Sequence, residues 1–207
     1  MTSSTPSAFS AIPPHLLIEN AFGGDMVARL LAHTMEQEDA FGTTTVGREK
    51  AQNSQIRRSR VTRDFGPMKA DVEAAFLAYR QQAISALRLA PFVVESLSME
   101  LAAHGDGDFY RRHIDTFIGQ EKAATDRILT GVYYFHTVPK AFTGGELRLF
   151  SLRPPEHGGS YQDVVPSCDS LLLFPAWVPH EVRPVSCPGC SFAQSRFAIN
   201  CWYNGVG

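Results

Sequence analysis

Three side chains of the kinds that bind metal ions stand at informative positions in the C-terminal half of the chain. His113 and Asp115 lie two residues apart in FYRRHID, a predicted strand, so both project from the same face. His180, in FPAWVPHEV, lies on a later predicted strand. Two imidazoles and one carboxylate on one side of an ion are the ligand set of oxygen-activating Fe(II) sites. We therefore predict an iron site at His113, Asp115 and His180.

A His-x-Asp pair is a short motif, and a structural role for it stays open in a chain with seven histidines. We interpret His104, His136 and His157 as structural or surface histidines, because imidazoles have many roles other than metal binding.

The last predicted strand, RFAINCWY, has two different faces. Alternation separates an apolar face (Phe197, Ile199, Cys201) from a face of mixed polarity (Arg196, Ala198, Asn200, Trp202). A buried guanidinium needs an anionic partner, and a carboxylate can bind it through two hydrogen bonds. The partner of Arg196 is then either a bound anion or a carboxylate of the protein. Arg183 is a poorer candidate, because its odd offset from His180 turns it to the opposite face.

The elements that must position these residues are helices followed by short strands. Apolar spacing predicts helices over residues 24–38 and 67–89, separated by a polar loop over residues 40–63. Strands are predicted over residues 92–103, 109–114, 128–136, 146–150, 170–174, 180–185 and 196–203. This order indicates an α+β protein: a double-stranded β-helix, or jelly roll, with N-terminal helices packed on one sheet.

We expect a flexible arm over residues 1–12 and a single domain over residues 13–207. Within that domain, residues 13–90 form the helical support and residues 91–207 the jelly-roll core.

Composition limits the classes of function. The apolar share of 44% favours a folded chain, and the net charge of −2 gives no overall attraction to nucleic acid or anionic membranes. No segment approaches the roughly 18 apolar residues that a membrane span needs, and the N-terminus lacks the pattern of a signal peptide. We therefore expect a cytoplasmic protein without a membrane partner.

The chain has four cysteines, too few for a disulfide scaffold, and a reducing compartment suits them. Cys187 and Cys190 form a C-x-x-C motif on a predicted hairpin loop, and the role of this pair stays open.

Four segments, FYRRHID, VYYFHTVPKAFTGGELRLF, LLLFPAWVPHEVRPV and RFAINCWY, resemble the 2-oxoglutarate/Fe(II) dioxygenase superfamily. The likeness covers roughly residues 93–204 and is strongest to the prolyl 4-hydroxylase branch. It implies that His113, Asp115 and His180 bind iron and that Arg196 binds the far carboxylate of 2-oxoglutarate. It also implies a small-molecule or peptide substrate. The sequence sets no oligomeric state.

The same resemblance assigns further residues to the cosubstrate site. Tyr134 matches a tyrosine that reaches the far carboxylate, and Leu147 matches an apolar wall of the pocket. Asn200 is a further candidate for cosubstrate binding, and Tyr110 and Trp202 are candidate pocket residues.

Two positions depart from the pattern of the branch. Ala103, with His104 beside it, stands where close relatives often carry a tyrosine that contacts the cosubstrate. The interval from His180 to Arg196 is also longer than usual, and SCPGCSFAQ predicts an enlarged hairpin loop there.

The resemblance implies a dioxygenase that hydroxylates an unactivated C–H bond and releases succinate and CO2, with ascorbate as a further reductant. Its substrate would be a prolyl peptide, a free amino acid or a related small molecule. Nucleic acid is not expected, because the second arginine that the demethylase branch carries near the position of Arg196 is absent. The alternatives are a cupin-type metalloenzyme that does not use 2-oxoglutarate and a non-catalytic jelly-roll binding module.

A basic loop over residues 47–63 carries Arg57, Arg58 and Arg60. It is interpreted either as a lid that clamps an acidic substrate or as an ordinary solvated loop.

Overall fold

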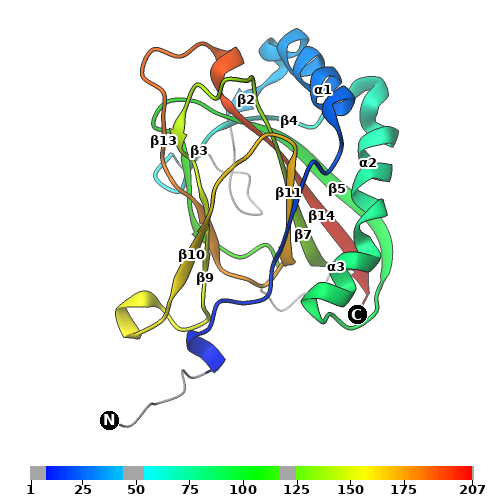
Figure 1. Ribbon diagram of the computed structural model, residues 1–207, viewed down its shortest axis with the longest axis vertical. Helices are drawn as coiled ribbons and strands as arrows, with labels where there is room; N and C mark the ends of the chain where they lie inside the picture. Colours follow the sequence, from blue (N-terminus) through cyan, green and yellow to red (C-terminus); the bar gives the residue numbers. More distant parts are fainter. Residues whose placement is uncertain (1–7, 44–53, 117–124, 207) are drawn as a thin grey trace.

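The computed structural model describes residues 8–43, 54–116 and 125–206, and it contains three α-helices within these ranges (Figure 1). They are α1 (Gly24–Glu36), α2 (Lys69–Ala78) and α3 (Arg80–Leu87). Short 3-10 helices lie at Ala8–Ser10, Glu38–Ala40, Gly66–Met68, Pro155–His157 and Phe192–Gln194.

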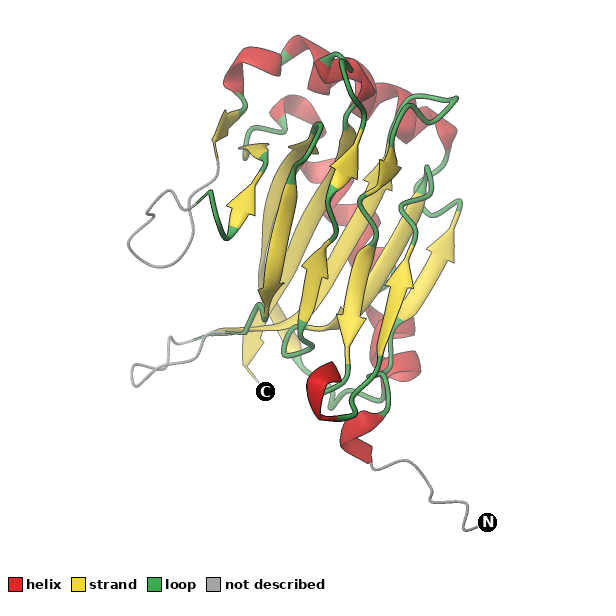
Figure 2. Cartoon of the chain, turned by 90° about the vertical axis from the view of Figure 1, so that its left-hand side faces the viewer, coloured by secondary structure: helices red, strands yellow, loops and turns green. Residues whose placement is uncertain are grey.

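Two antiparallel sheets face each other and form the body of the protein (Figure 2). The larger sheet has the order β1 (Leu16–Glu19), β11 (Ser170–Pro175), β7 (Asp126–Phe135), β14 (Arg196–Val206), β5 (Val93–His104), β4 (Arg60–Thr62) and β2 (Gly42–Thr43). The smaller sheet has the order β10 (Tyr161–Val164), β9 (Leu147–Phe150), β12 (His180–Val182), β6 (Phe109–His113) and β3 (Arg57–Arg58). A separate ribbon pairs β8 (Thr143–Gly144) with β13 (Val185–Ser186). The predicted α+β jelly roll is confirmed.

The helices cover the outer face of the larger sheet (Figure 1). Leu30 of α1, Phe76 of α2 and Leu87 of α3 belong to one buried apolar cluster with Tyr133 and Ile199 of the sheet. Strand alternation sends every second residue of β7 and β14 toward these helices. The predicted packing of N-terminal helices on one sheet is confirmed.

The opposite face of the larger sheet looks toward the smaller sheet. Its apolar part includes Val132, Tyr134 and Ala198, which pack with Leu147 of β9 in a second buried cluster. Ala198 lies on the face of β14 that also carries Arg196, as the alternation of this strand predicted. The polar side chains of the candidate site therefore share the space between the two sheets.

Two predicted boundaries were wrong. The single helix expected over residues 67–89 is two helices, because the chain tightens at Tyr79: its N–H bonds to the carbonyl of Phe76, three residues earlier, and its hydroxyl is held by the carbonyl of Ala21. The polar loop expected over residues 40–63 contains three short strands: β2 pairs with β4 within this stretch, whereas β3 and β4 pair with β6 and β5, which follow much later in the chain.

Parts of other predictions lie outside the described residues, namely residues 1–7 of the expected arm and residues 47–53 of the basic loop. The carbonyls of Phe9 and Ser10 accept hydrogen bonds from the Arg153 backbone and the Ser160 hydroxyl. Among the described residues, no helix has the length and apolar character needed to cross a bilayer.

Candidate functional site

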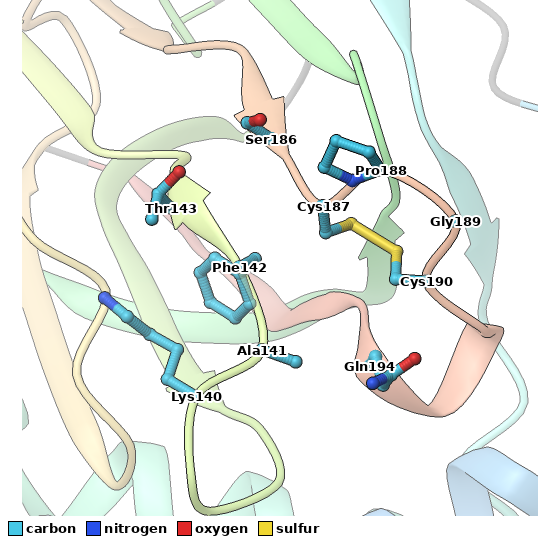
Figure 3. Close-up of a pocket in the computed structure, with 10 residues that line it drawn as sticks. All are labelled: Lys140, Ala141, Phe142, Thr143, Ser186, Cys187, Pro188, Gly189, Cys190 and Gln194. Atoms are coloured by element: carbon cyan, nitrogen blue, oxygen red, sulfur yellow. A yellow bond between two sulfur atoms is a disulfide. The ribbon is translucent and has the colours of Figure 1, made fainter.

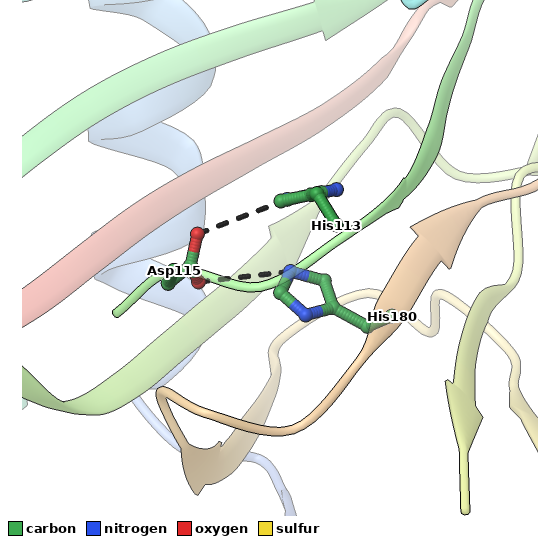
Figure 4. Close-up of side chains that lie close together, drawn as sticks. All are labelled: His113, Asp115 and His180. Carbon is green, nitrogen blue, oxygen red and sulfur yellow. Dashed lines mark ion pairs between the residues drawn. The ribbon is translucent and has the colours of Figure 1, made fainter. Parts of the chain in front are cut away.

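The three predicted metal ligands converge between the sheets (Figure 4). His113 ends β6 and His180 begins β12, where the two residues are directly paired. The Nε2 atom of His113 lies 3.7 Å from Oδ1 of Asp115, and Nε2 of His180 lies 3.6 Å from Oδ2. One potential ligand atom from each residue lies within 4.8 Å of the other two. This spacing suits one ion bound by all three side chains.

Both imidazoles are oriented by backbone carbonyls. Nδ1 of His113 lies 2.8 Å from the carbonyl oxygen of Arg111, and Nδ1 of His180 lies 2.9 Å from that of Val178. A carbonyl can only accept, so each Nδ1 carries the proton and each Nε2 keeps a free lone pair. The two lone pairs are thus on the nitrogens that face Asp115.

Burial and neighbouring charges favour the ligating protonation states. Burial, reinforced by His180, lowers the pKa of His113 to about 3, so this imidazole is neutral near pH 7. Burial alone would raise the pKa of Asp115, but His180, His113 and the Thr130 hydroxyl together hold it below its ordinary value. The hydroxyl of Thr130 donates to Oδ2 of Asp115 at 2.8 Å. Neutral imidazoles and an ionised carboxylate are the forms that bind metal ions.

Tyr110, a predicted pocket residue, lies against the metal-binding group although it stands three residues before His113. The pairing of β6 with β12 changes register between His113 and Tyr110, so that Arg111 and Arg112 of β6 lie opposite Glu181 of β12 alone. Such a β-bulge reverses the alternation. The rings of Tyr110 and His113 consequently stack with centroids 3.6 Å apart.

Arg196 starts β14 and is 1% exposed. Its Nε donates to the carbonyl of Gly145 at 2.8 Å, and its guanidinium carbon lies 5.0 Å from the ring centroid of Tyr134. No carboxylate in the described part of the chain forms an ion pair with it, and its Nη2 has no partner there. The alternative of a carboxylate partner from the protein is therefore not seen among these residues.

The surroundings of Arg196 are closely packed. Gly145 has φ +70°, and a Cβ at this position would lie 2.6 Å from Cδ of Arg196, so glycine lets the backbone approach the guanidinium. The hydroxyl of Tyr134 is buried without a hydrogen-bond partner among the described residues. Burial raises the pKa of Tyr134 to about 12, although Arg196 opposes this. Leu147 is buried in the same apolar cluster as Tyr134.

The other residues predicted on β14 face different neighbours. Asn200 donates to Oε1 of Glu100 at 3.4 Å, and the two residues are paired across β14 and β5. The Trp202 ring lies 4.0 Å below the guanidinium carbon of Arg127. Its indole N–H is buried and unpartnered within the described residues. Trp202 is paired across the sheet with Thr130, which donates a hydrogen bond to Asp115, so it lies near the metal-ligand group.

The three arginines of the predicted lid have different partners in the structure. Arg57 is buried, and its Nη2 lies 2.6 Å from Oε1 of Glu100. Arg58 contacts the Asp108 carboxylate at 3.3 Å, and Arg60 donates to the carbonyl of Glu38 at 2.6 Å. Arg58 and Arg60 thus form contacts between segments of the protein itself. Arg57 is the one that reaches the site, since its guanidinium carbon lies 4.8 Å from the ring centroid of Tyr110.

Sequence reasoning missed two buried polar residues of β5, His104 and Glu100. Nδ1 of His104, predicted to be a structural or surface histidine, lies 3.4 Å from Nη1 of Arg196. Glu100 lies 3.3 Å from Arg63 as well as beside Arg57. A signal was present: in the run MELAAH these two residues occupy the same strand face, and both interrupt an otherwise apolar segment.

The C-x-x-C pair closes on itself beside a hollow of about 400 Å³ (Figure 3). Cys187 and Cys190 form a disulfide across the Pro188-Gly189 turn, where the N–H of Cys190 bonds to the carbonyl of Cys187. Cys168 and Cys201 are free. Two of the four cysteines are thus free, as expected for a reducing compartment, whereas Cys187 and Cys190 are joined by a disulfide.

Comparison with known proteins places this arrangement in a family. The family model of the 2OG-Fe(II) oxygenase superfamily matches residues 99–204. An uncharacterized PKHD-type hydroxylase of Synechocystis sp. is 42% identical over 120 residues, which are 56% of this chain and 39% of that relative. The chain thus matches well under half the length of this curated relative.

Two solved structures have the same fold. A prolyl-4-hydroxylase of Pseudomonas putida superposes with a TM-score of 0.65 at 24% identity, over 94% of each chain. A prolyl hydroxylase of Trichoplax adhaerens, solved with a hypoxia inducible factor peptide fragment, gives a TM-score of 0.66 at 21% identity over 92% of this chain and 83% of that one. Since the family model covers half of the sequence, this chain belongs to the 2OG-Fe(II) oxygenase superfamily.

Proposed function

We propose that the protein is an Fe(II)- and 2-oxoglutarate-dependent hydroxylase in which His113, Asp115 and His180 hold the iron. The observation that carries this proposal is the presence of two groups with unused binding capacity between the two sheets. One is a metal-ligand set with two free imidazole lone pairs. The other is Arg196, a buried guanidinium with an unpartnered Nη2 within the described residues.

The residues fit 2-oxoglutarate because the metal ligands lie beside Thr130 and Trp202, whereas the donors of Arg196 lie six residues earlier on β14. Arg196 and Tyr134 would bind the far carboxylate, since both have a buried polar atom without a partner in the described chain. Leu147 would form an apolar wall beside the carbon chain of the cosubstrate. Asn200, predicted as a further contact, would act from its position beside Glu100.

With iron and cosubstrate bound, the site would support O2-dependent hydroxylation of a C–H bond with release of succinate and CO2. The protein's own contribution is positioning. The carbonyls of Arg111 and Val178 fix the imidazoles, and the Thr130 hydroxyl fixes the carboxylate of Asp115. Burial of Asp115 and His180 excludes bulk water from the metal end.

We propose a prolyl peptide, a free amino acid or a related small molecule as the substrate, with the site of hydroxylation near Tyr110 and Trp202. Support comes from the shared fold of structures described as prolyl hydroxylases. Arg57 adds a cation beside Tyr110 and is the remaining candidate for substrate contact from the basic loop. Neither nucleic acid nor membrane is proposed as a partner, and ascorbate is proposed as a reductant in a cytoplasmic setting.

Anaerobic binding tests the proposal. Fe(II) and 2-oxoglutarate, added together to the purified protein, should give the weak visible charge-transfer band of their chelate. The band should be lost in His113→Ala and kept in His157→Ala, a matched histidine that is exposed. Iron binding without a band that depends on 2-oxoglutarate would instead identify a cupin-type metalloenzyme. Absence of iron binding would identify a non-catalytic module.

A further inference from the structure

His104 and Arg196 face each other across neighbouring strands of the larger sheet. They are direct partners in the register of β5 and β14, and Nδ1 of His104 lies 3.4 Å from Nη1 of Arg196. A guanidinium can only donate, so Nδ1 of His104 is the accepting nitrogen. The proton of the neutral imidazole then resides on Nε2. The contact with Arg196 therefore makes His104 Nε2 a hydrogen-bond donor.

This donor has no acceptor in the described part of the chain, although His104 is 2% exposed. Two neighbouring donors, Nη2 of Arg196 and the hydroxyl of Tyr134, also lack a hydrogen-bond partner in the described part of the chain. The three residues come from β5, β14 and β7, which are adjacent in the sheet. A buried donor without an acceptor is costly, so three of them in one place indicate a ligand with several acceptor sites.

The chemistry of the three donors defines that ligand. Arg196 contributes the positive charge, whereas His104 is neutral, because burial, together with Arg196 and Arg57, lowers its pKa well below its ordinary value. A carboxylate carries one negative charge and about four lone-pair sites, and it can therefore accept all three hydrogen bonds. A neutral ligand would leave the charge of Arg196 without a partner.

We propose that His104 is a positioning residue of the cosubstrate site, donating from Nε2 a third hydrogen bond, beside Arg196 and Tyr134, to the far carboxylate of 2-oxoglutarate. This inference rests on the proposed function. It adds a residue to the site and predicts that His104 discriminates between 2-oxo acids with and without a second carboxylate.

His136 provides a matched comparison. It too is buried, and its Nε2 also lacks a partner among the described residues. Its Nδ1, however, lies 2.8 Å from the carbonyl oxygen of Thr137 and must carry the proton. Nε2 of His136 is therefore an acceptor and cannot donate to an anion. Two buried histidines of the same site region thus have opposite tautomers, and only His104 suits a carboxylate.

The test compares two ligands and three variants by anaerobic calorimetry with bound Fe(II). His104→Leu should weaken binding of 2-oxoglutarate about 10- to 100-fold, the range for one hydrogen bond to a charged group. His104→Gln, whose amide can donate from a similar position, should stay within about 3-fold of the wild type. 2-Oxobutanoate, which lacks the far carboxylate, should bind equally to the wild type and His104→Leu. His136→Leu should not change the ratio between the two ligands.

Several outcomes would overturn the inference. Unchanged 2-oxoglutarate affinity in His104→Leu would mean that a trapped water accepts the bond. Equal weakening of both ligands would mean that His104 only supports the fold. A wild type that binds iron but no 2-oxoglutarate would overturn the proposed function and this inference with it.

A second measurement needs no leucine variant. In imidazole ¹⁵N spectra of the Zn(II) protein, assigned with His104→Gln, addition of 2-oxoglutarate should shift the Nε2–H signal of His104 and slow its exchange with water. An unshifted signal at saturating 2-oxoglutarate would also overturn the inference.

Discussion

Two buried arginines between the sheets are in opposite situations. Arg57, on the smaller sheet, binds the Glu100 carboxylate at 2.6 Å and the Ser59 hydroxyl at 3.0 Å. Arg196, on the larger sheet, has a backbone carbonyl and an imidazole as its hydrogen-bond partners, and no ion pair within the described residues. The charge of Arg57 is thus balanced within the protein, whereas that of Arg196 needs an anion from outside. Burial alone would not distinguish them; their partners do.

The largest expected effect concerns ligand binding at Arg196. Arg196→Met should weaken 2-oxoglutarate binding at least about 100-fold, because it removes the cation that balances the far carboxylate. The free energy of unfolding should stay unchanged or rise, since a buried charge without a carboxylate partner is replaced by an apolar chain. Calorimetry and urea denaturation of the same sample measure both quantities. A variant that binds 2-oxoglutarate normally would show that another residue holds the carboxylate.

Arg57→Met should show the reverse pattern. We expect the free energy of unfolding to fall by about 3 kcal/mol, because Glu100 would remain buried without its closest partner. Arg63 and Asn200 still contact Glu100, which places the loss at the low end of the usual range. Affinity for 2-oxoglutarate should change by less than about 3-fold.

The double variant Arg57→Met/Glu100→Gln is the control for this prediction, measured by urea denaturation beside the single variant. It should recover much of the lost stability, because no unpaired charge is left at this position. If the single and double variants are equally unstable, the loss comes from packing rather than from charge.

Ligand binding should also separate the two arginines in a thermal melt. At a 2-oxoglutarate concentration about 100 times its dissociation constant, with iron bound, the folded state gains about 2.7 kcal/mol. For a chain of this size the melting temperature should then rise by roughly 5–10 °C. The rise should be kept in Arg57→Met and lost in Arg196→Met at the same ligand concentration. Equal rises in both variants would contradict the distinction between the two sites.

The sequence was sufficient for features that depend on local alternation. The two faces of residues 196–202 differ so clearly that the orientation of Arg196 could be predicted. His180 could be placed on a later strand than His113 because a short β-rich run follows FPAWVP. The helix at α1 and the longer strands β5, β7, β11 and β14 were predicted for the same reason. Each of these features depends on residues that are close together in the chain.

What could not be predicted depends on distant partners. The stacking of Tyr110 on His113 requires a bulge in β6 that exists only because of its pairing with β12. The inward position of Arg57 depends on Glu100, 43 residues away. The hydrogen-bond role of His104 depends on Arg196, which is 92 residues away. No local pattern encodes these partners, so the sequence alone predicts a polar loop where the structure has β3 and Arg57.

The smallest expected effect concerns His104, the neighbour of Arg196 on β5, and the pH dependence of the free energy of unfolding. Because burial lowers the pKa of His104 well below 6.5, the unfolded chain takes up a proton at this imidazole near pH 6 and the folded protein does not. Stability from this residue is therefore complete above about pH 6.5 and is lost as the pH falls below that value, by at most about 1.4 kcal/mol per pH unit. His104→Gln should remove this contribution, so its free energy of unfolding should fall less steeply than that of the wild type between pH 6.5 and 5. Arg196→Met should leave part of the slope in place, since burial is the larger cause and the charge of Arg196 the smaller one. Urea denaturation at several pH values measures these slopes. Parallel curves for the wild type and His104→Gln would mean that His104 takes up a proton in the folded protein as readily as in the unfolded chain.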